Sequence, residues 1–139
     1  MKRQQKYPDT DTFHYYNANP KNRITGDCRI RGIAVACEVP YNQVVMDLAQ
    51  IQCETGYDQC ANQGISILME RYGWVKHKQP RKPDNTKYTG KEFCEMIAKK
   101  DQRYFCNIGG NHEVAIVDCK VWDIWDSTVK CVGNYWTKG

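Results

Sequence analysis

Two short segments of the sequence carry residues that could act together as a nucleophile and a base. Gly26-Asp27-Cys28 stands where a helical pattern begins, and Asn111-His112 stands where a strand pattern begins. A thiol at a helix N-terminus lies at the positive end of the helix dipole, which lowers its pKa, and the free backbone N–H groups there can stabilise an oxyanion. A histidine on a sheet packed against that helix completes a thiolate–imidazolium pair. Cys28 and His112 are therefore the candidate nucleophile and general acid/base for acyl transfer.

A third side chain is expected to orient the imidazole of His112 through its other ring nitrogen. Asp123 and Asp126 both lie on or just after the next strand pattern, and the turn between the two strands decides which one faces the histidine. A three-residue loop at 118–120 sets Asp126 opposite His112 on one sheet face, whereas a two-residue turn favours Asp123. Glu113 alternates to the other face, where we expect it to be solvated.

Apolar residues at helical spacing predict the element that carries Cys28. Thr25 or Asp27 is expected to cap the N-terminus of this helix, because both residue types favour that position, and Pro40 stops it. Further helices are expected over 44–51, from Asn62 or Gln63 to Gly73, and after the capping-box sequence Thr89-Gly90-Lys91-Glu92.

Segments rich in Val, Ile, Trp and Tyr predict strands, and most of them follow the helices. They lie at 74–77, 103–108, 112–117, 120–125 and 129–136. Helices first and a sheet second favour an α+β architecture. Residues 1–24 are polar with little periodicity, so we expect an N-terminal arm or loop preceding one catalytic domain at 25–139. The length of 139 residues fits a single domain.

The charge pattern gives no strong reason to expect nucleic-acid binding. The chain has 20 Lys and Arg against 16 Asp and Glu, a formal charge of +4. Basic residues gather at the N-terminus and around two prolines at 80 and 83. A solvated tail and a solvated loop explain so small an excess, and no zinc finger or helix-turn-helix sequence accompanies it.

The eight cysteines are dispersed along the chain and include no C-x-x-C pair. A structural zinc site is therefore not expected, and the pattern calls for neither a metal nor a cofactor. The N-terminal residues lack the apolar core of a signal peptide, and no apolar stretch is long enough to span a membrane. We therefore expect reduced thiols in a cytoplasmic protein without a membrane partner.

Three segments of the chain resemble a family of small papain-like proteins from bacteria and their phages. They are Gly26-Asp27-Cys28-Arg29-Ile30-Arg31, Asn111-His112-Glu113-Val114-Ala115-Ile116 and Trp122-Asp123-Ile124-Trp125-Asp126-Ser127. A broader likeness links them to bacteriocin-processing peptidase domains, which also place Asp before the nucleophilic Cys. The resemblance covers roughly residues 12–136 and preserves the order Cys, His, Asp. It implies a papain-like fold, with the nucleophile helix packed across an antiparallel sheet of about four or five strands.

The resemblance also implies roles for individual residues. Cys28 becomes the nucleophile and His112 the general acid/base. Asp126 is preferred as the third member, because its separation from His112 is near that usual in papain-like folds; Asp123 is the alternative. Such enzymes usually supply a Gln amide to the oxyanion hole about six residues before the nucleophile. Asn22 stands there in this sequence, with Asn17 as the alternative.

The function expected from these residues is that of a cysteine hydrolase, in the first place a peptidase. It would cleave a peptide or amide bond of a peptide or protein substrate through a Cys-His-Asp triad and a thioester intermediate. Two alternatives stay open: a cell-wall peptide amidase, and a catalytically inactive papain-like module that binds a host protein. For a phage-encoded protein, the expected location is the cytoplasm of the bacterial host.

Overall fold

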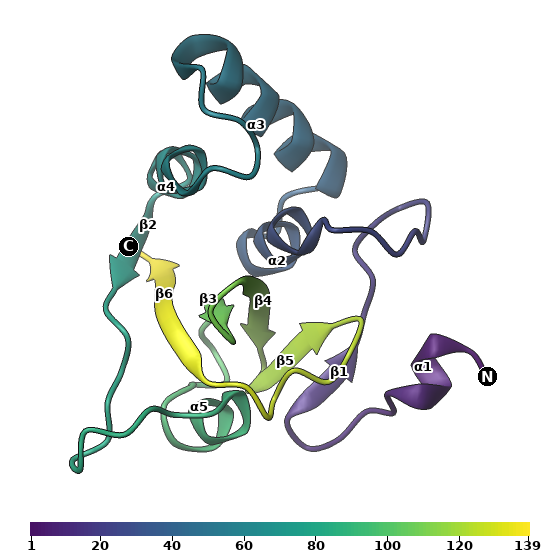
Figure 1. The fold of residues 1–139 in the computed structure, drawn as a ribbon, viewed down its shortest axis with the longest axis vertical. Coiled ribbons are helices and arrows are strands. Elements are labelled where there is room, and N and C mark those ends of the chain that lie inside the picture. The colour runs from purple at the N-terminus through teal and green to yellow at the C-terminus, as the bar shows by residue number, and fades with distance from the viewer.

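A six-stranded mixed sheet runs through the molecule, and helices pack on both of its faces (Figure 1). The structure, a computed structural model, describes residues 1–139. The strand order is β1-β5-β4-β3-β6-β2, and each neighbouring pair is antiparallel except β1 with β5. The strands are β1 (Phe13–Tyr15), β2 (Trp74–His77), β3 (Tyr104–Ile108), β4 (His112–Val117), β5 (Lys120–Asp123) and β6 (Val132–Lys138). The fold class is therefore α+β, as the sequence predicts.

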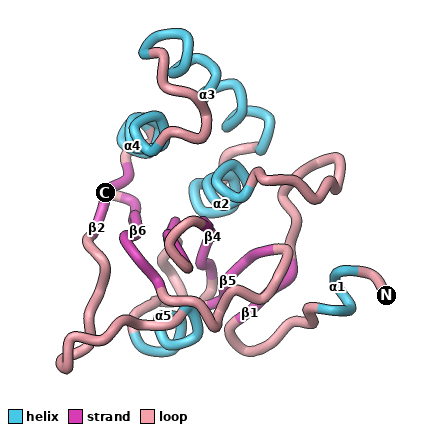
Figure 2. The backbone as a smooth tube through the Cα atoms, viewed as in Figure 1, coloured by secondary structure: helices cyan, strands magenta, loops and turns pink.

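Three helices lie on one side of the sheet and one lies on the other (Figures 1 and 2). The helices are α1 (Arg3–Lys6), α2 (Cys28–Cys37), α3 (Tyr41–Thr55), α4 (Asn62–Arg71) and α5 (Gly90–Met96). α2 packs directly on β4, α3 packs on α2 and α4, and α5 covers the opposite face. α5 begins with the predicted capping box, because the Thr89 hydroxyl accepts the Glu92 N–H at 3.1 Å and the Glu92 carboxylate accepts the Thr89 N–H at 3.0 Å.

Alternation along β4 sends successive side chains into two separate cores. Ala115 and Val117 join the core beneath α2, α3 and α4, whereas Val114 and Ile116 join the core beneath α5. Both faces of β4 are therefore covered, and its near-continuous apolar sequence follows from that.

Helix α2 lies unusually close to the sheet that it crosses. It begins at Cys28, directly after the cap candidate Asp27, and ends at Cys37; Glu38 follows with a φ of 57° and forms a left-handed cap. Ile33 is fully buried on its inner face. A Cβ added at Gly32 would lie 2.9 Å from the Phe105 ring, so glycine permits this approach. The tight packing holds the helix N-terminus, and with it Cys28, at a defined place above β4.

A two-residue turn joins β4 to β5 and decides the register of the two strands. Asp118 and Cys119 adopt φ of 54° and 57°, the left-handed conformations of a type I′ hairpin. With this turn the side chain of Asp123 falls on the same sheet face as that of His112. The three-residue loop expected from the sequence does not form.

The N-terminal residues 1–24 contribute a strand, contrary to the expectation of an arm or loop. β1 pairs in parallel with β5, and Phe13 is fully buried in the core beneath α5. The sheet accordingly has six strands and one parallel pair, rather than four or five antiparallel strands. A three-residue strand has too few positions to show alternation, so its pattern is not recognisable along the chain.

Candidate active site

Cys28 occupies the first position of α2 and is half-buried beside the first residues of β4. Burial is the largest influence on the pKa of its thiol and raises it. A hydrogen bond with His112 and another with the Glu113 backbone N–H act in the opposite sense, and the charges of His112 and Arg31 add to them. The net effect lowers the pKa of Cys28 below its ordinary value, which favours the thiolate.

His112 begins β4 and lies between the thiol and a buried carboxylate. Its Nε2 is 2.6 Å from Oδ2 of Asp123, which leaves Nδ1 as the nitrogen for Cys28. Burial lowers the pKa of the imidazole. Hydrogen bonds to Asp123 and to Cys28, and the charges of both, outweigh burial and raise the pKa to about 9. The imidazolium and the thiolate therefore stabilise each other.

Asp123 is held rigidly at the end of β5. Its side chain is 1% exposed. Oδ1 accepts the Ile124 N–H at 2.7 Å and a guanidinium N–H of Arg31 at 3.1 Å, and Oδ2 accepts the Ser127 hydroxyl at 3.2 Å. A carboxylate with this many donors is fixed in orientation, as a partner for His112 requires.

Asp126 does not lie beside His112, so the sequence-based preference for it is wrong on position. Its carboxylate accepts the backbone N–H of Thr128 at 3.0 Å and the hydroxyl of Thr128 at 2.5 Å. It closes a local turn, as Asp commonly does. The two-residue hairpin turn is the physical reason, because it shortens the loop by one residue and puts Asp123 on the histidine's face.

Arg31 connects Asp123 to Asp27, the residue before Cys28, a contact that the sequence reasoning missed. Its guanidinium is buried, with Nε 2.8 Å from Oδ1 of Asp27 and Nη1 3.1 Å from Oδ1 of Asp123. Asp27 also accepts the Tyr41 hydroxyl at 2.6 Å and the Asn19 amide at 3.1 Å. Asp27 and Arg31 are four residues apart at a helix start, and this spacing could have predicted an ion pair between them.

The oxyanion donors of this site come from the α2 backbone. No side chain caps the helix, and its first backbone hydrogen bond runs from the Arg31 N–H to the Asp27 carbonyl at 3.0 Å. The N–H groups of Cys28, Arg29 and Ile30 therefore have no acceptor within the protein. These are donors placed beside the sulfur, where an oxyanion would develop.

The two asparagines expected near the oxyanion are not hydrogen-bonded to the site. The Asn17 amide donates to the Arg23 carbonyl at 3.0 Å and to the Asn22 side-chain oxygen at 3.3 Å. Asn22 is exposed and has a φ of 52°, so it forms part of a turn that folds the loop on itself. Local hydrogen bonding thus engages the loop amides, and neither contacts Cys28 or His112 through a hydrogen bond.

An aromatic residue forms a wall beside the imidazole. The ring of Trp125 lies 5.0 Å from that of His112, centroid to centroid, with a tilt of 42°. It shields one side of the imidazole from water, which strengthens its hydrogen bond to Asp123.

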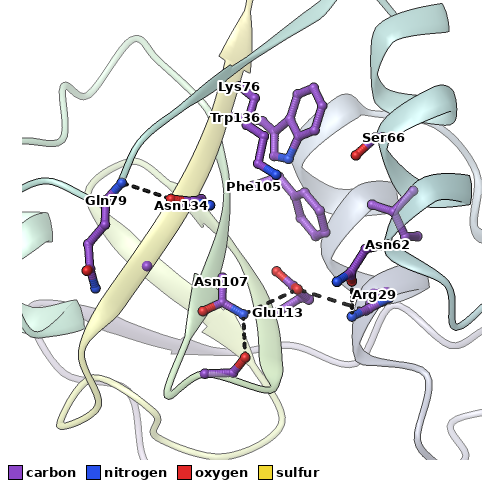
Figure 3. A pocket seen from close by; sticks show the side chains of 13 residues that line it. Arg29, Asn62, Ser66, Lys76, Gln79, Phe105, Asn107, Glu113, Asn134 and Trp136 are labelled. Carbon is purple, nitrogen blue, oxygen red and sulfur yellow. Dashed lines mark hydrogen bonds and ion pairs between the residues drawn. The ribbon is translucent and has the colours of Figure 1, made fainter.

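A pocket of about 350 Å³ lies between α2, α4 and the sheet (Figure 3). Arg29 and Glu113, the residues that follow Cys28 and His112 in sequence, both line it. Glu113 is not solvated as expected: its side chain is 13% exposed, and burial raises its pKa. Alternation along β4 correctly places it opposite to His112, but α2 and α4 cover that face of the sheet.

None of the other seven cysteines is the first residue of a helix, as Cys28 is. All eight are free, and burial raises the pKa of Cys37 and of Cys94 to about 12. No group of three or more His, Cys, Asp or Glu side chains is arranged to hold a metal ion. None of the helices has both the length and the apolar character needed to cross a membrane.

Comparison of the chain with family models, curated proteins and solved structures finds no match in any of the three. The geometry of the site therefore carries the functional argument.

Proposed function

We propose that this protein is a cysteine hydrolase of papain-like type, acting on a peptide or protein substrate. One observation carries the proposal: His112, whose Nε2 lies 2.6 Å from the buried carboxylate of Asp123, is also close enough to Cys28 for each of the two groups to shift the pKa of the other. A half-buried thiol with a lowered pKa beside a histidine with a raised pKa is an arrangement suited to nucleophilic catalysis.

The arrangement of elements supports the papain-like assignment. The nucleophile begins a helix that crosses the sheet, the histidine begins a central strand, and the carboxylate ends the neighbouring strand. The residues occur in the order Cys, His, Asp along the chain. Asp123 takes the third role in this proposal, because it is the carboxylate that contacts His112.

Each catalytic step uses a group already in place. The Cys28 thiolate attacks the scissile carbonyl carbon, and the oxygen becomes an oxyanion near the free N–H groups of α2. The C–N bond then breaks as the His112 imidazolium gives its proton to the leaving amine, which leaves a thioester on Cys28. A water molecule attacks the thioester while His112 takes its proton. The C–S bond breaks, so the carboxylic acid leaves and the thiolate returns.

Sub-stoichiometric labelling with iodoacetamide, read by intact mass and peptide mapping, tests the proposal. Exposure alone ranks Cys53 and Cys60 first, because both are exposed whereas Cys28 is half-buried. The proposed thiolate reverses that order, and Cys28 is labelled first at mildly acidic pH. The His112→Ala variant loses this preference, and the Cys28→Ser variant loses the fast phase altogether.

A Cys28 that reacts no faster than the exposed thiols contradicts the proposal. The protein is then better explained as a binding module without hydrolase activity. A fast Cys28 justifies a substrate screen in which peptide amides and cell-wall peptides are compared, since the same triad serves both.

A further inference from the structure

The pocket lined by Arg29 and Glu113, the residues that follow Cys28 and His112 in sequence, is formed by six different elements of the fold. Figure 3 shows side chains from α2, α4, β2, β3, β4 and β6 around it. Phe105 and Trp136 contribute buried aromatic surface, while most of the other lining residues are polar. An apolar base with several polar groups above it is the usual composition of a site that binds a small polar group.

The charges that line the pocket leave one cation without a partner. Glu113 lies 3.9 Å from Arg29 and accepts a hydrogen bond from the Asn107 amide at 3.5 Å, so its charge is already matched. Lys76 makes no ion pair and no hydrogen bond with its ammonium group, which lies 5.9 Å from the centre of the Trp136 ring. The lining therefore has a net positive charge, and Lys76 is its one charged residue that forms no ion pair.

The uncharged polar groups of the lining also favour a ligand that accepts hydrogen bonds. The Asn62 oxygen accepts from Arg29 at 2.7 Å and the Asn134 oxygen accepts from the Gln79 N–H at 2.9 Å. Their amide N–H groups, and the hydroxyl of Ser66, have no partner within the protein and line the same space. The lining therefore offers a ligand two free amide groups, one hydroxyl and one ammonium as hydrogen-bond donors.

We propose that this pocket binds an acidic side chain of the substrate, so that the enzyme prefers peptides with Glu or Asp next to, or one residue from, the cleaved bond. The carboxylate accepts from Lys76 and from the free amide donors, while the side-chain methylenes contact Phe105 and Trp136. This inference rests on the proposed hydrolase function, because it assigns the pocket to the substrate of Cys28. It goes beyond that function by naming the chemical class of the recognised residue.

Peptidyl chloromethyl ketones test the preference without knowledge of the natural substrate. The thiolate forms a C–S bond to the methylene carbon as the C–Cl bond breaks and chloride leaves. The probes carry Glu, Gln or Lys at the first or second residue before the reactive carbon, with Ala at the other position. The rate of Cys28 labelling by each probe is divided by the iodoacetamide rate of the same variant, which removes differences in thiol reactivity.

We expect the Glu probe to label the wild-type protein about three- to fivefold faster than the Gln probe at one of the two positions, the range for a partly exposed charge pair. The Lys probe is the slowest. The Lys76→Glu variant reverses the order of Glu and Lys. The Lys100→Glu variant keeps the wild-type order, because Lys100 is an exposed lysine outside the lining and carries the same change of charge.

The two proposals fail in different ways. Slow labelling of Cys28 by iodoacetamide overturns the hydrolase function itself. Fast iodoacetamide labelling with equal rates for the Glu and Gln probes at both positions overturns only the acidic specificity. A Lys probe faster than the Glu probe also overturns it, and indicates that Glu113 rather than Lys76 selects the substrate.

Discussion

Replacement of Arg31 by Met tests whether the buried guanidinium holds the active site together. Arg31 is 6% exposed and lies between two carboxylates, at 2.8 Å from Asp27 and 3.1 Å from Asp123. The substitution leaves both carboxylates buried without a cation. Loss of one partner from a buried ion pair costs about 3–5 kcal/mol of unfolding free energy, a large share of the ~5–15 kcal/mol that typical domains have.

Urea unfolding, followed by the fluorescence of the four tryptophans, measures this loss. Arg29→Met is the matched control, because Arg29 is partly exposed: it loses an ion pair at 3.9 Å and hydrogen bonds to the Cys60 carbonyl and the Asn62 oxygen, so we expect a loss of about 1–2 kcal/mol. Arg31→Lys keeps the charge, but the single ammonium group cannot bind both carboxylates as the planar guanidinium does. Its loss of unfolding free energy should therefore lie between those of Arg29→Met and Arg31→Met. Adding Asp27→Asn to Arg31→Met should cost less than the sum of the two single changes.

A second measurement separates a positioning role from a purely structural one. The charge of Arg31 helps to lower the pKa of Cys28. In a folded Arg31 variant, the pH at which iodoacetamide labels Cys28 should therefore rise, whereas the Arg29 variant should keep the wild-type profile. Equal stability losses for Arg31→Met and Arg29→Met, together with unchanged pH profiles, would refute the reasoning.

Three other predictions concern the carboxylates, the pH dependence and the helix packing. Asp123→Asn should slow Cys28 labelling at mildly acidic pH, because the raised pKa of His112 depends on that carboxylate, while Asp126→Asn should leave the rate unchanged; equal effects would contradict the assignment. Hydrolysis should rise as pH increases through the lowered pKa of Cys28, because the thiolate forms. It should fall as pH passes about 9, where His112 loses the proton needed by the leaving amine; a rate–pH profile still rising above pH 9 would contradict this. Gly32→Ala adds a Cβ at 2.9 Å from a buried ring, so overpacking of about 1–3 kcal/mol should exceed a helix-propensity gain of about 1 kcal/mol, measurable as a lower midpoint in urea.

The sequence by itself determined the features that depend on neighbouring residues. The start of a helix at Cys28, the capping box at Thr89 and the strand that begins at His112 are local, and the structure confirms each of them. Helix caps and alternating patterns need only a few adjacent side chains, so a sequence shows them directly. Cys28 and His112 could be chosen as the candidate nucleophile and base on this ground alone.

The length of the turn between β4 and β5 decides which carboxylate contacts His112, and a difference of one residue is enough to change it. Asp118 and Cys119 both adopt positive φ, a conformation that Gly or Asn would have signalled more clearly. A change of one residue in the turn moves the side chains of β5 to the other face, which is why Asp126 was preferred and Asp123 is found.

Only the tertiary structure decided which distant segments meet. Phe13 reaches β5 across more than a hundred positions of sequence, Arg31 meets Asp123 across 92, and Glu113 lines a pocket together with residues of α2 and α4, which precede it. These contacts depend on how the sheet is ordered and on which helices cover each face. Their energies come from burial and from paired charges in a shared interior, and those quantities do not exist until the chain has folded.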